Sequence, residues 1–484
     1  MQSSAHTIVI VGGGFSGTIL AANLLRRAAP VRTRVVLMER GSGVGSGIAY
    51  APRYRSCLLN VPAGRMSAVS GEPLQLVEFA RRLLPGTGAD TYLPRALYGE
   101  YLRHVLAQAE SAAPPHVRLH CVRAQVDAVH PLRSNGQWLV DAGGRTWLAD
   151  EVVLACGDPP PLPRAYASQA EEHPAYVRDP HRQEWMRSGD EQVLLIGTGL
   201  TMADVAASAA DRAVRLTALS RHGLLPQAQN PPAPAMLGSA QELLAGLETL
   251  RPRQVVATVR ALARTVQTQG GDWREVITAV RELAPRLWQG WTETERRRFL
   301  RHVRAYWDVH RHRLPPSLAA KLQSMQGSGR LQVHAGTLQQ LIPAGEHILA
   351  RWRPRGAREL REQLFDRVID CTGSDHRLQR TRDGLLRQLL DAGLISADPQ
   401  GLGLRSGRHG VLIGAGGQIT RGLFYLGPML RAAYWEATAV GELRRRAEEL
   451  AQMLSEARAP GGSRTPDPQV RSLMLYPAEL RAQR

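Results

Sequence analysis

The chain has 484 residues, 43% of them hydrophobic and 21% charged, and 61 Lys+Arg against 43 Asp+Glu give a formal net charge of +18. This composition is typical of a globular protein of two or three domains, and it excludes bulk disorder and a fibrous repeat. No run approaches the roughly 20 apolar residues of a membrane span, and no signal peptide precedes the first apolar segment. We therefore expect a cytoplasmic protein without a membrane partner.

The positive charge consists almost entirely of arginine, since Lys321 is the one lysine. Residues 251–313 hold 14 arginines and 6 acids, and so supply +8 of the +18. Nucleic-acid binding would need basic residues interleaved with exposed aromatic residues, or a known module. The sequence shows neither, and the preference for arginine over lysine is more typical of genomic base composition. We expect no nucleic-acid partner.

The chain opens with a pattern typical of a dinucleotide-binding unit. His6–Val11 predicts a buried strand, the turn Gly12–Gly17 follows at once, and Thr18–Arg27 predicts a helix. Val35–Met38 predicts a second strand, which ends at Glu39. The glycines permit a tight turn, close approach of a pyrophosphate and close helix–strand packing, and an acid at the second strand binds a ribose diol. The alternative is a glycine turn in an α/β fold without a ligand.

The next segments predict a loop and more strands. Residues 41–71 are rich in Gly, Pro and Ser, and predict an ordered loop. The patterns at 116–130 and 137–148 predict β-strands, and Glu151–Gly157 predicts a strand that ends in glycine.

A second, imperfect dinucleotide unit follows the proline-rich connection 159–163. A strand at Gln192–Ile196 leads into Gly197-Thr198-Gly199 and a helix to about 210, and Met202 replaces the third glycine. After the next strand, at Arg215–Leu219, Ser220 and Arg221 stand where an acid would bind a free ribose. A serine and an arginine suit the 2′-phosphate of NADP better than the free 2′-hydroxyl of NAD. The alternative is a degenerate fold that only packs against the first unit.

The remaining segments predict a long helical stretch and then a return to strands. Residues 240–326 look helical throughout, 330–353 predict strands, and Asp366–Gly373 repeats the strand that ends in glycine. A strand, glycines and a helix close the patterned chain at about 446. The tail from 447 begins with a possible helical extension to 458, and the Pro/Gly/Ser-rich composition that follows predicts disorder.

The helical stretch allows two interpretations. Four of the nine tryptophans lie in it, and Phe299, Val303, Tyr306 and His310 recur at helical spacing, which is usually a core pattern. The alternative is a helical cap whose arginines meet an anionic substrate or the NADP phosphate. His310 and His312 are two residues apart and do not share a helix face, so we expect no metal pair. The four cysteines form no CxxC pair, and we expect them to be buried, reduced residues.

Eight motifs resemble the bacterial NAD(P)/FAD-binding family of the two-dinucleotide-binding-domain flavoproteins, which is related to N-hydroxylating flavin monooxygenases. The resemblance extends over about 6–446 and is carried by Gly12–Thr18, Gly45–Tyr50, Leu58–Ser67, Leu93–Leu102, Gly197–Val205, Ser220–Pro226, Trp307–Pro315 and Phe424–Arg444.

The resemblance implies how FAD is held. FAD would bind the first unit, with Asn60-Val61-Pro62 along the cofactor and with Gly427 and Pro428 close to the flavin. Cys57 stands where relatives would have a histidine, so this chain departs from the family at that position. The Leu58–Ser67 stretch is equally well explained as a rigid loop beneath the cofactor and as a catalytic segment.

The motifs favour one flavin chemistry over others. Disulfide reduction needs paired cysteines, and the FxGxxxHxxxW pattern of Baeyer–Villiger enzymes is absent between residues 157 and 190 although His173 and Trp185 lie there. Two dinucleotide units in one chain suit hydride transfer from a nicotinamide to a flavin. We expect an FAD-dependent NAD(P)H oxidoreductase, with a monooxygenase acting on an amine or another small metabolite favoured. A flavin reductase or dehydrogenase without oxygen activation and a non-catalytic flavin-binding sensor remain as alternatives.

We therefore expect an α/β fold with two Rossmann-like dinucleotide-binding domains, the second inserted in the first, and a helical insertion. The expected boundaries are 1–186 and 374–446 for the FAD-binding domain, 187–373 for the NAD(P)-binding domain with its insertion at about 240–326, and 447–484 for a mostly disordered tail. Flavin chemistry needs no protein catalyst, so no catalytic residue or metal ligand is assigned. The expected cofactor-binding residues are Gly12, Gly13, Gly14, Phe15, Ser16, Gly17, Glu39, Arg40, Asn60, Val61, Gly157, Gly197, Gly199, Leu200, Thr201, Ser220, Arg221, Gly373, Gly427 and Pro428.

Overall fold

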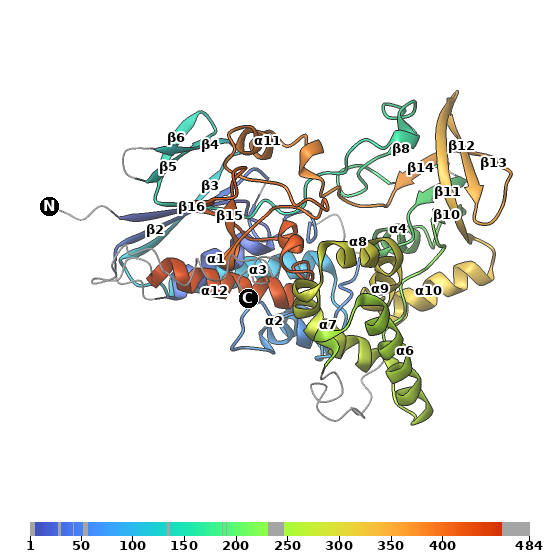
Figure 1. Cartoon of the computed structure of the whole chain (residues 1–484), viewed down its shortest axis with the longest axis horizontal. Coiled ribbons are helices and arrows are strands. Elements are labelled where there is room, and N and C mark those ends of the chain that lie inside the picture. Colours follow the sequence, from blue (N-terminus) through green and yellow to red (C-terminus); the bar gives the residue numbers. More distant parts are fainter. Residues whose placement is uncertain are drawn as a thin grey trace, which may run out of the picture.

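The computed structural model describes residues 5–27, 31–41, 43–51, 57–132, 136–185, 187–189, 191–230 and 246–456. Figure 1 shows two sheet-containing parts side by side, with a group of helices between and below them. Within the described residues, no helix is long and apolar enough to cross a membrane.

The first part is built on a six-stranded sheet with the order β15-β16-β7-β1-β2-β3. All neighbours pair in parallel except β15 and β16, which are antiparallel. Parallel pairing places the carboxyl ends of β1, β2 and β7 at one edge of the sheet. The strands are β1 (His6–Val11), β2 (Thr33–Glu39), β3 (Val117–Arg123), β7 (Glu151–Leu154), β15 (Val411–Ile413) and β16 (Ile419–Tyr425).

Strand periodicity explains how this sheet is covered on both faces. Ile8 and Ile10 of β1 point to a core shared with helices α1, α3 and α12, whereas Val9 and Val11 point to the opposite core. The opposite face is covered by helix α11 and a three-stranded antiparallel sheet. These elements are α1 (Phe15–Arg26), α2 (Gln75–Leu83), α3 (Arg95–Ser111), α11 (Gly384–Asp391), α12 (Val440–Glu456), β4 (Val126–Leu132), β5 (Gln137–Ala142) and β6 (Arg145–Ala149).

The second part is built on a seven-stranded sheet with the order β13-β12-β11-β10-β9-β14-β8. Its centre is parallel, and β11, β12 and β13 form an antiparallel meander at one edge. Helices α4 and α10 cover one face. These elements are β8 (Tyr176–Val177), β9 (Gln192–Ile196), α4 (Leu200–Ser208), β10 (Arg215–Ser220), α10 (Pro316–Gly327), β11 (Leu331–Ala344), β12 (His347–Pro354), β13 (Arg361–Phe365) and β14 (Arg367–Asp370).

The chain leaves the first sheet after β7 and returns to it with β15, so the second sheet is inserted within the first part. This confirms the expected fold of two Rossmann-like units. Parallel strands joined through helices are what a βαβ sequence pattern predicts.

The stretch expected to be helical at 240–326 forms five separate α-helices from residue 252 onward. Residues 231–245 lie outside the described residues. The helices are α6 (Pro252–Thr268), α7 (Trp273–Gly290), α8 (Glu293–His302), α9 (Arg304–Arg311) and α10. Helices α6 to α9 share one core with Leu402 and Trp435 of the returning chain, so they are attached to the first part as well as to the second (Figure 1).

The last described element is α12, which continues ten residues past Arg446. Its Ala447, Leu450, Ala451 and Leu454 are buried in the core that contains α1. The rest of the expected disordered tail, 457–484, lies outside the described residues.

Candidate functional site

The turn after β1 can be formed only with glycine at two positions. Gly12 has φ = 107°, and a Cβ atom there would lie 2.5 Å from the Ala155 carbonyl oxygen. A Cβ atom on Gly17 would lie 1.9 Å from the Gly12 carbonyl oxygen. The third glycine therefore lets α1 pack directly against the turn, as the sequence spacing predicts.

The space in front of this turn is open at Gly14. A Cβ atom on Gly14 would meet only the Cα atom of Gly47, at 3.6 Å. Gly14 precedes α1, which has no side-chain cap and no acid in its first turn, while Phe15 and Ser16 are buried. Uncapped N–H groups at a helix start bind phosphate. The residues present thus fit a dinucleotide pyrophosphate.

Glu39, at the end of β2, is fixed beside the same turn. Its two carboxylate oxygens accept hydrogen bonds of 2.7 Å from the backbone N–H groups of Gly13 and Gly41. Each oxygen keeps a second lone pair, so the carboxylate can also accept from ribose hydroxyls. Arg40, the next residue, is exposed.

The segment with Asn60 and Val61 is held against the start of α3. The Leu59 and Ala63 N–H groups donate to the carbonyl oxygens of Leu93 and Thr91, at 2.8 and 2.9 Å. Asn60 and Val61 are both partly buried, and Cys57 is buried at the start of the segment. The segment is therefore a loop fixed by backbone hydrogen bonds, which both sequence interpretations allow.

Tyr425 connects two predicted residues, Gly157 and Gly427, that are far apart in the sequence. Its hydroxyl donates to the Gly157 carbonyl oxygen at 3.0 Å, and a Cβ atom on Gly427 would lie 2.8 Å from that hydroxyl. Pro428 begins the short 3-10 helix Pro428–Ala432 directly after Gly427. Sequence reasoning missed Tyr425, because its role depends on pairing between strands β7 and β16.

The turn after β9 repeats the first turn with one difference. Gly197 has φ = 100°, and its N–H donates to the Leu219 carbonyl oxygen at 2.8 Å. Helix α4 again has no side-chain cap, and Gly199 faces open space. Met202 is fully buried in the sheet core, and thus fills the room that a third glycine would leave. Leu200 and Thr201, in the first turn of α4, are partly buried.

Ser220 and Arg221 differ in what they can offer a ligand. The Ser220 hydroxyl belongs to the turn itself, since it lies 2.9 Å from Thr198 Oγ1 and accepts from the Gly223 N–H at 3.0 Å. Arg221 is exposed. Arg355, just after β12, approaches the ring of His222 at 3.5 Å. Burial, followed by the charges of Arg355 and Arg221, lowers the pKa of His222. Arg355 was missed because it lies more than a hundred residues away in sequence.

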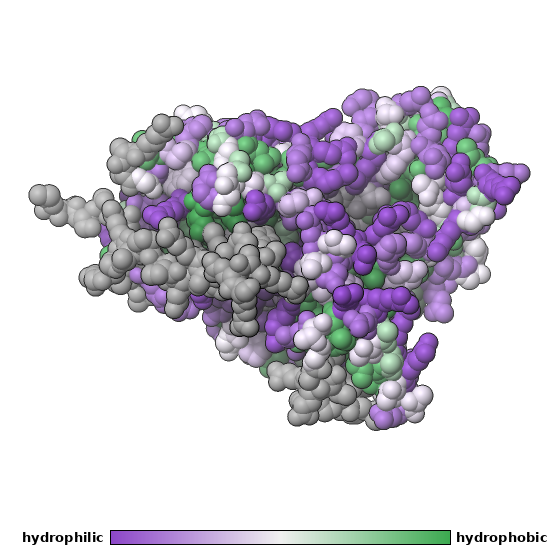
Figure 2. All heavy atoms as spheres, viewed as in Figure 1, coloured by the Kyte–Doolittle hydropathy of each residue, from purple (hydrophilic) through white to green (hydrophobic). Residues whose placement is uncertain are grey.

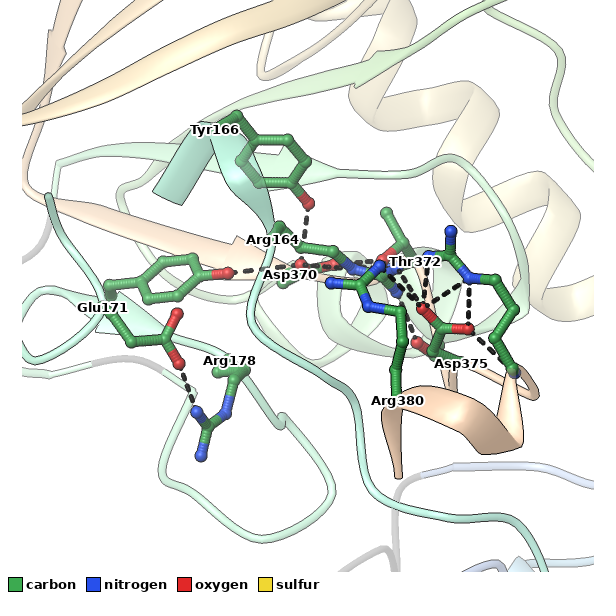
Figure 3. Close-up of polar contacts among 11 residues, drawn as sticks. Arg164, Tyr166, Glu171, Arg178, Asp370, Thr372, Asp375 and Arg380 are labelled. Carbon is green, nitrogen blue, oxygen red and sulfur yellow. Dashed lines mark hydrogen bonds and ion pairs between the residues drawn. The ribbon is translucent and has the colours of Figure 1, made fainter. Parts of the chain in front are cut away.

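The two segments that cross between the sheets are held together by the charged groups in Figure 3. Asp370, 2% exposed, accepts hydrogen bonds from the hydroxyls of Tyr166 and Tyr176 at 2.8 and 3.2 Å. Arg164, on the outgoing segment, donates to the Gly373 carbonyl oxygen at 3.0 Å and pairs with Asp375 at 3.7 Å. Gly373 thus lies within a clasp between the outgoing and returning segments.

The cysteines do not form a redox centre. None of the four forms a disulfide, Cys57 and Cys371 are buried as expected, and Cys156 is only partly buried. The expectation was wrong for Cys121, which is exposed because burial along the edge strand β3 declines from Val117 towards the carboxyl end of the strand. Burial raises the pKa of Cys121, of Cys371 and, to about 12, of Cys156, so none is an activated thiolate. Within the described ranges, no group of three or more His, Cys, Asp or Glu could hold a metal ion.

The helical stretch contains buried core residues as well as the exposed Tyr306 beside His222. Trp288 and Trp291 are buried with Phe299, and Trp288 stacks on Trp435 with ring centroids 4.6 Å apart. The helical spacing predicted a core position for Tyr306. The structure differs, because the chain breaks between α8 and α9 and Tyr306 lies outside the core. It is 38% exposed and lies 5.8 Å from the ring of His222. Helix α9 therefore covers the ligand side of the second turn.

The comparisons with known proteins agree with this geometry. A family model described as FAD-NAD(P)-binding matches residues 9–159, the segment that contains the first turn, Glu39 and Gly157. Residues 9–159 are an FAD-NAD(P)-binding domain. No curated protein shows a significant sequence match.

Solved structures with the same fold as the whole chain include three amino-acid hydroxylases. Ornithine hydroxylase from Pseudomonas aeruginosa is 17% identical, with a TM-score of 0.61 over 94% of this chain and 99% of that one. The ornithine N-hydroxylase of Kutzneria sp. 744, solved with reduced FAD, NADP+ and L-ornithine, is 16% identical, with a TM-score of 0.60 over 94% and 100%. L-lysine 6-monooxygenase from Pseudomonas syringae is 18% identical, with a TM-score of 0.60 over 94% and 100%. The FAD-NAD(P)-binding domain is thus part of a two-dinucleotide fold.

Proposed function

We propose that the protein is an FAD-dependent NAD(P)H oxidoreductase, and within that class a monooxygenase acting on a small metabolite. The observation that carries the proposal is the pair of glycine turns at 12–17 and 197–199. Each turn precedes an uncapped helix at the carboxyl edge of a parallel sheet. Such edges are where open α/β sheets bind nucleotides.

The residues divide between two cofactors. Gly12, Gly14 and Gly17 shape the site for the FAD pyrophosphate, and Glu39 accepts from its ribose. Asn60, Val61, Gly427 and Pro428 would lie along the isoalloxazine ring. Bound FAD would accept a hydride from the reduced nicotinamide and pass electrons to oxygen.

The second turn holds the nicotinamide nucleotide. Gly197 forms the tight turn, Gly199 leaves room for the pyrophosphate at the start of α4, and the exposed Arg221 with Arg355 provides two positive charges for a 2′-phosphate. Ser220 acts indirectly, because its hydroxyl fixes the loop that carries Arg221. Tyr306 closes the adenosine side from α9.

Two features favour monooxygenase chemistry over the rival functions. Three of the four cysteine thiols have raised pKa values and the sequence holds no CxxC pair, so the chain shows no disulfide-exchange motif. The helices α6 to α9 pack against Leu402 and Trp435 of the returning chain, and a cover at this place would keep water away from reactive flavin species. A reductase that never activates oxygen would need no such cover.

Product analysis tests the proposal. The FAD-loaded protein is incubated with NADPH, oxygen and a panel of amines and carboxylic acids, and hydroxylated product is measured by mass spectrometry beside hydrogen peroxide. We expect at least one compound to raise NADPH oxidation and lower the peroxide released per NADPH. Stoichiometric peroxide with every compound would support the reductase alternative, and no NADPH oxidation would support the binding protein.

A further inference from the structure

An unusual excess of arginine lies between the helical insertion and the segment that returns after Gly427. Five arginines and two acids form this group, which we call the arginine cluster: Arg281, Arg304, Arg311, Arg313, Arg431, Asp308 and Glu436. They come from α7, from α9 and the residues after it, and from the returning chain at 428–436. In Figure 2, hydrophilic residues dominate the surface where α8 and α9 lie.

The two acids neutralise only part of this charge. The Glu436 side chain is 5% exposed. It forms an ion pair with Arg281 at 3.1 Å and a second ion pair with Arg311. Asp308 pairs with Arg304 at 3.4 Å. The cluster therefore keeps three more positive than negative charges.

Arg313 and Arg431 carry the unmatched charge. Arg313 is 9% exposed and donates a 3.3 Å hydrogen bond to the Thr278 hydroxyl, while its Nε has no hydrogen-bond partner among the described residues. Arg431 lies over the Trp435 ring at 4.8 Å, and its buried Nε likewise has no partner in the described part of the chain. Burial lowers the pKa of both to about 10, so both stay charged at neutral pH.

Asp272 acts on Arg313, and Asp308 and Asp158 act on Arg431, but the cluster as a whole keeps an excess of buried positive charge, which is unfavourable unless an anion binds it. The positive charges of the cluster also affect His312. Burial, followed by the charges of Arg311, Arg431, Arg281 and Arg304, holds the pKa of His312 well below its ordinary value. His312 therefore adds no positive charge to the cluster, whereas the five arginines stay charged. A bound anion would offset this excess positive charge.

The cluster borders the expected flavin side of the site. Arg431 comes three residues after Pro428, within the same short helix. The positive charges of Arg313 and Arg65 both lower the pKa of Tyr92, against the larger opposite effect of burial. The residues on either side of Tyr92, Thr91 and Leu93, accept the hydrogen bonds that hold the segment with Asn60. Arg313 and Arg431 are therefore near both segments that the proposed function assigns to the flavin.

We propose that the arginine cluster binds the acidic groups of an anionic substrate, carboxylate or phosphate, beside the flavin. This inference rests on the proposed function. It makes the substrate an acid and not a diamine, because the positive charge of the arginine cluster would repel an ammonium group of the substrate. Guanidinium groups pair with both kinds of anion through charge-assisted hydrogen bonds.

Calorimetric titration of the FAD-loaded protein at constant ionic strength tests the proposal, with succinate, inorganic phosphate, cadaverine and NADPH as separate probes. The variants are Arg313→Gln and Arg431→Gln. The matched control is Arg297→Gln, whose side chain is 66% exposed and pairs with Glu293 on the surface of α8. Arg313→Lys keeps the charge, and covers the case in which the glutamine variant fails to fold.

We expect succinate or phosphate to bind, and the two probes show which anion the cluster prefers. Each glutamine variant should weaken that binding about ten- to hundredfold, as the loss of one charged hydrogen bond would do. Arg313→Lys should lose less, and the control and NADPH binding should not change. The proposal is overturned if neither anion binds, if cadaverine binds better, or if the variants weaken NADPH and spare the anions. Flavin content and anaerobic flavin reduction, measured on the same samples, test the proposed function separately.

Discussion

At the scale of single residues, the first turn separates two requirements for glycine. Gly14 faces open space, so Gly14→Val should leave the fold intact and abolish FAD binding, because the side chain would occupy the place of the pyrophosphate. Gly17→Ala should instead destabilise the apoprotein, since its Cβ atom would overlap the Gly12 carbonyl oxygen. FAD released on denaturation and the melting temperature of the apoprotein distinguish the two. Full FAD occupancy in Gly14→Val would refute the assignment of this turn.

Arg221 and Arg355 should set the preference for NADPH. Arg221→Ala should reduce the preference for NADPH over NADH about ten- to hundredfold, because one charged contact to the 2′-phosphate is lost. Arg355→Ala should act in the same direction, and Arg253→Ala, an exposed arginine of α6, serves as the control. The measurement is the rate of anaerobic flavin reduction with each nucleotide. Equal rates in the unaltered protein would contradict this prediction.

Local motifs predicted the two turns, because Gly12 and Gly197 adopt positive φ and Gly17 lies directly against the Gly12 carbonyl oxygen. Ser220 was predicted as a ligand residue, whereas the structure places its hydroxyl within the turn. Tyr425 and Arg355 could not be found in this way, since each reaches the site only through strand pairing or a distant hairpin.

At the scale of elements, the clasp between the crossing segments should respond to acid. Burial alone would raise the pKa of Asp375, but hydrogen bonds from Arg377 and the charge of Arg164 outweigh it and hold the pKa at about 2. Since the ordinary value is about 3.9, the charged carboxylate stabilises the fold fully above about pH 4. That contribution disappears as the pH falls towards 2.

Asp375→Asn should therefore lower stability at neutral pH and flatten its decline between about pH 4 and 2. Urea unfolding at a series of pH values measures both effects. Asp127→Asn, an exposed acid of β4, is the control. A variant whose acid profile matches that of the unaltered protein would show that Asp375 is not held by the clasp.

Helix α12 predicts where the chain can be shortened. Its last buried residue is Leu454, so a chain that ends after Arg458 should keep its FAD content and melting temperature. A chain that ends after Leu443 should be strongly destabilised, because Leu450 and Leu454 leave the core and each buried leucine contributes about 2–5 kcal/mol. Thermal melting compares the two. Loss of soluble protein after the shorter deletion would mean that residues 459–484 dock on the fold.

The helical stretch shows what periodicity could and could not predict. Its helical character followed from spacing, and Phe299 is core as that spacing required. The break between α8 and α9 turns Tyr306 towards His222, and no repeat in the sequence marks it. The packing of α7 on Trp435 was equally invisible, because its partner comes from the returning chain.

At the scale of the whole molecule, the insertion, the returning segment and the clasp tie the two sheets together. Trp288 stacks on Trp435 and donates to the Ala432 carbonyl oxygen at 2.9 Å, and Arg95 of α3 pairs with Asp204 of α4 at 2.9 Å. These contacts hold the first and second turns in one assembly. We propose that such an arrangement serves hydride transfer between the two cofactors.

Anaerobic mixing of the purified protein with NADPH tests this account most directly. We predict that the protein carries FAD, that its visible flavin absorbance disappears on mixing, and that NADH acts more slowly. Oxygen added afterwards should restore the absorbance by way of a transient species that absorbs at shorter wavelength than oxidised flavin. A flavin that stays oxidised in the presence of excess NADPH would contradict the account.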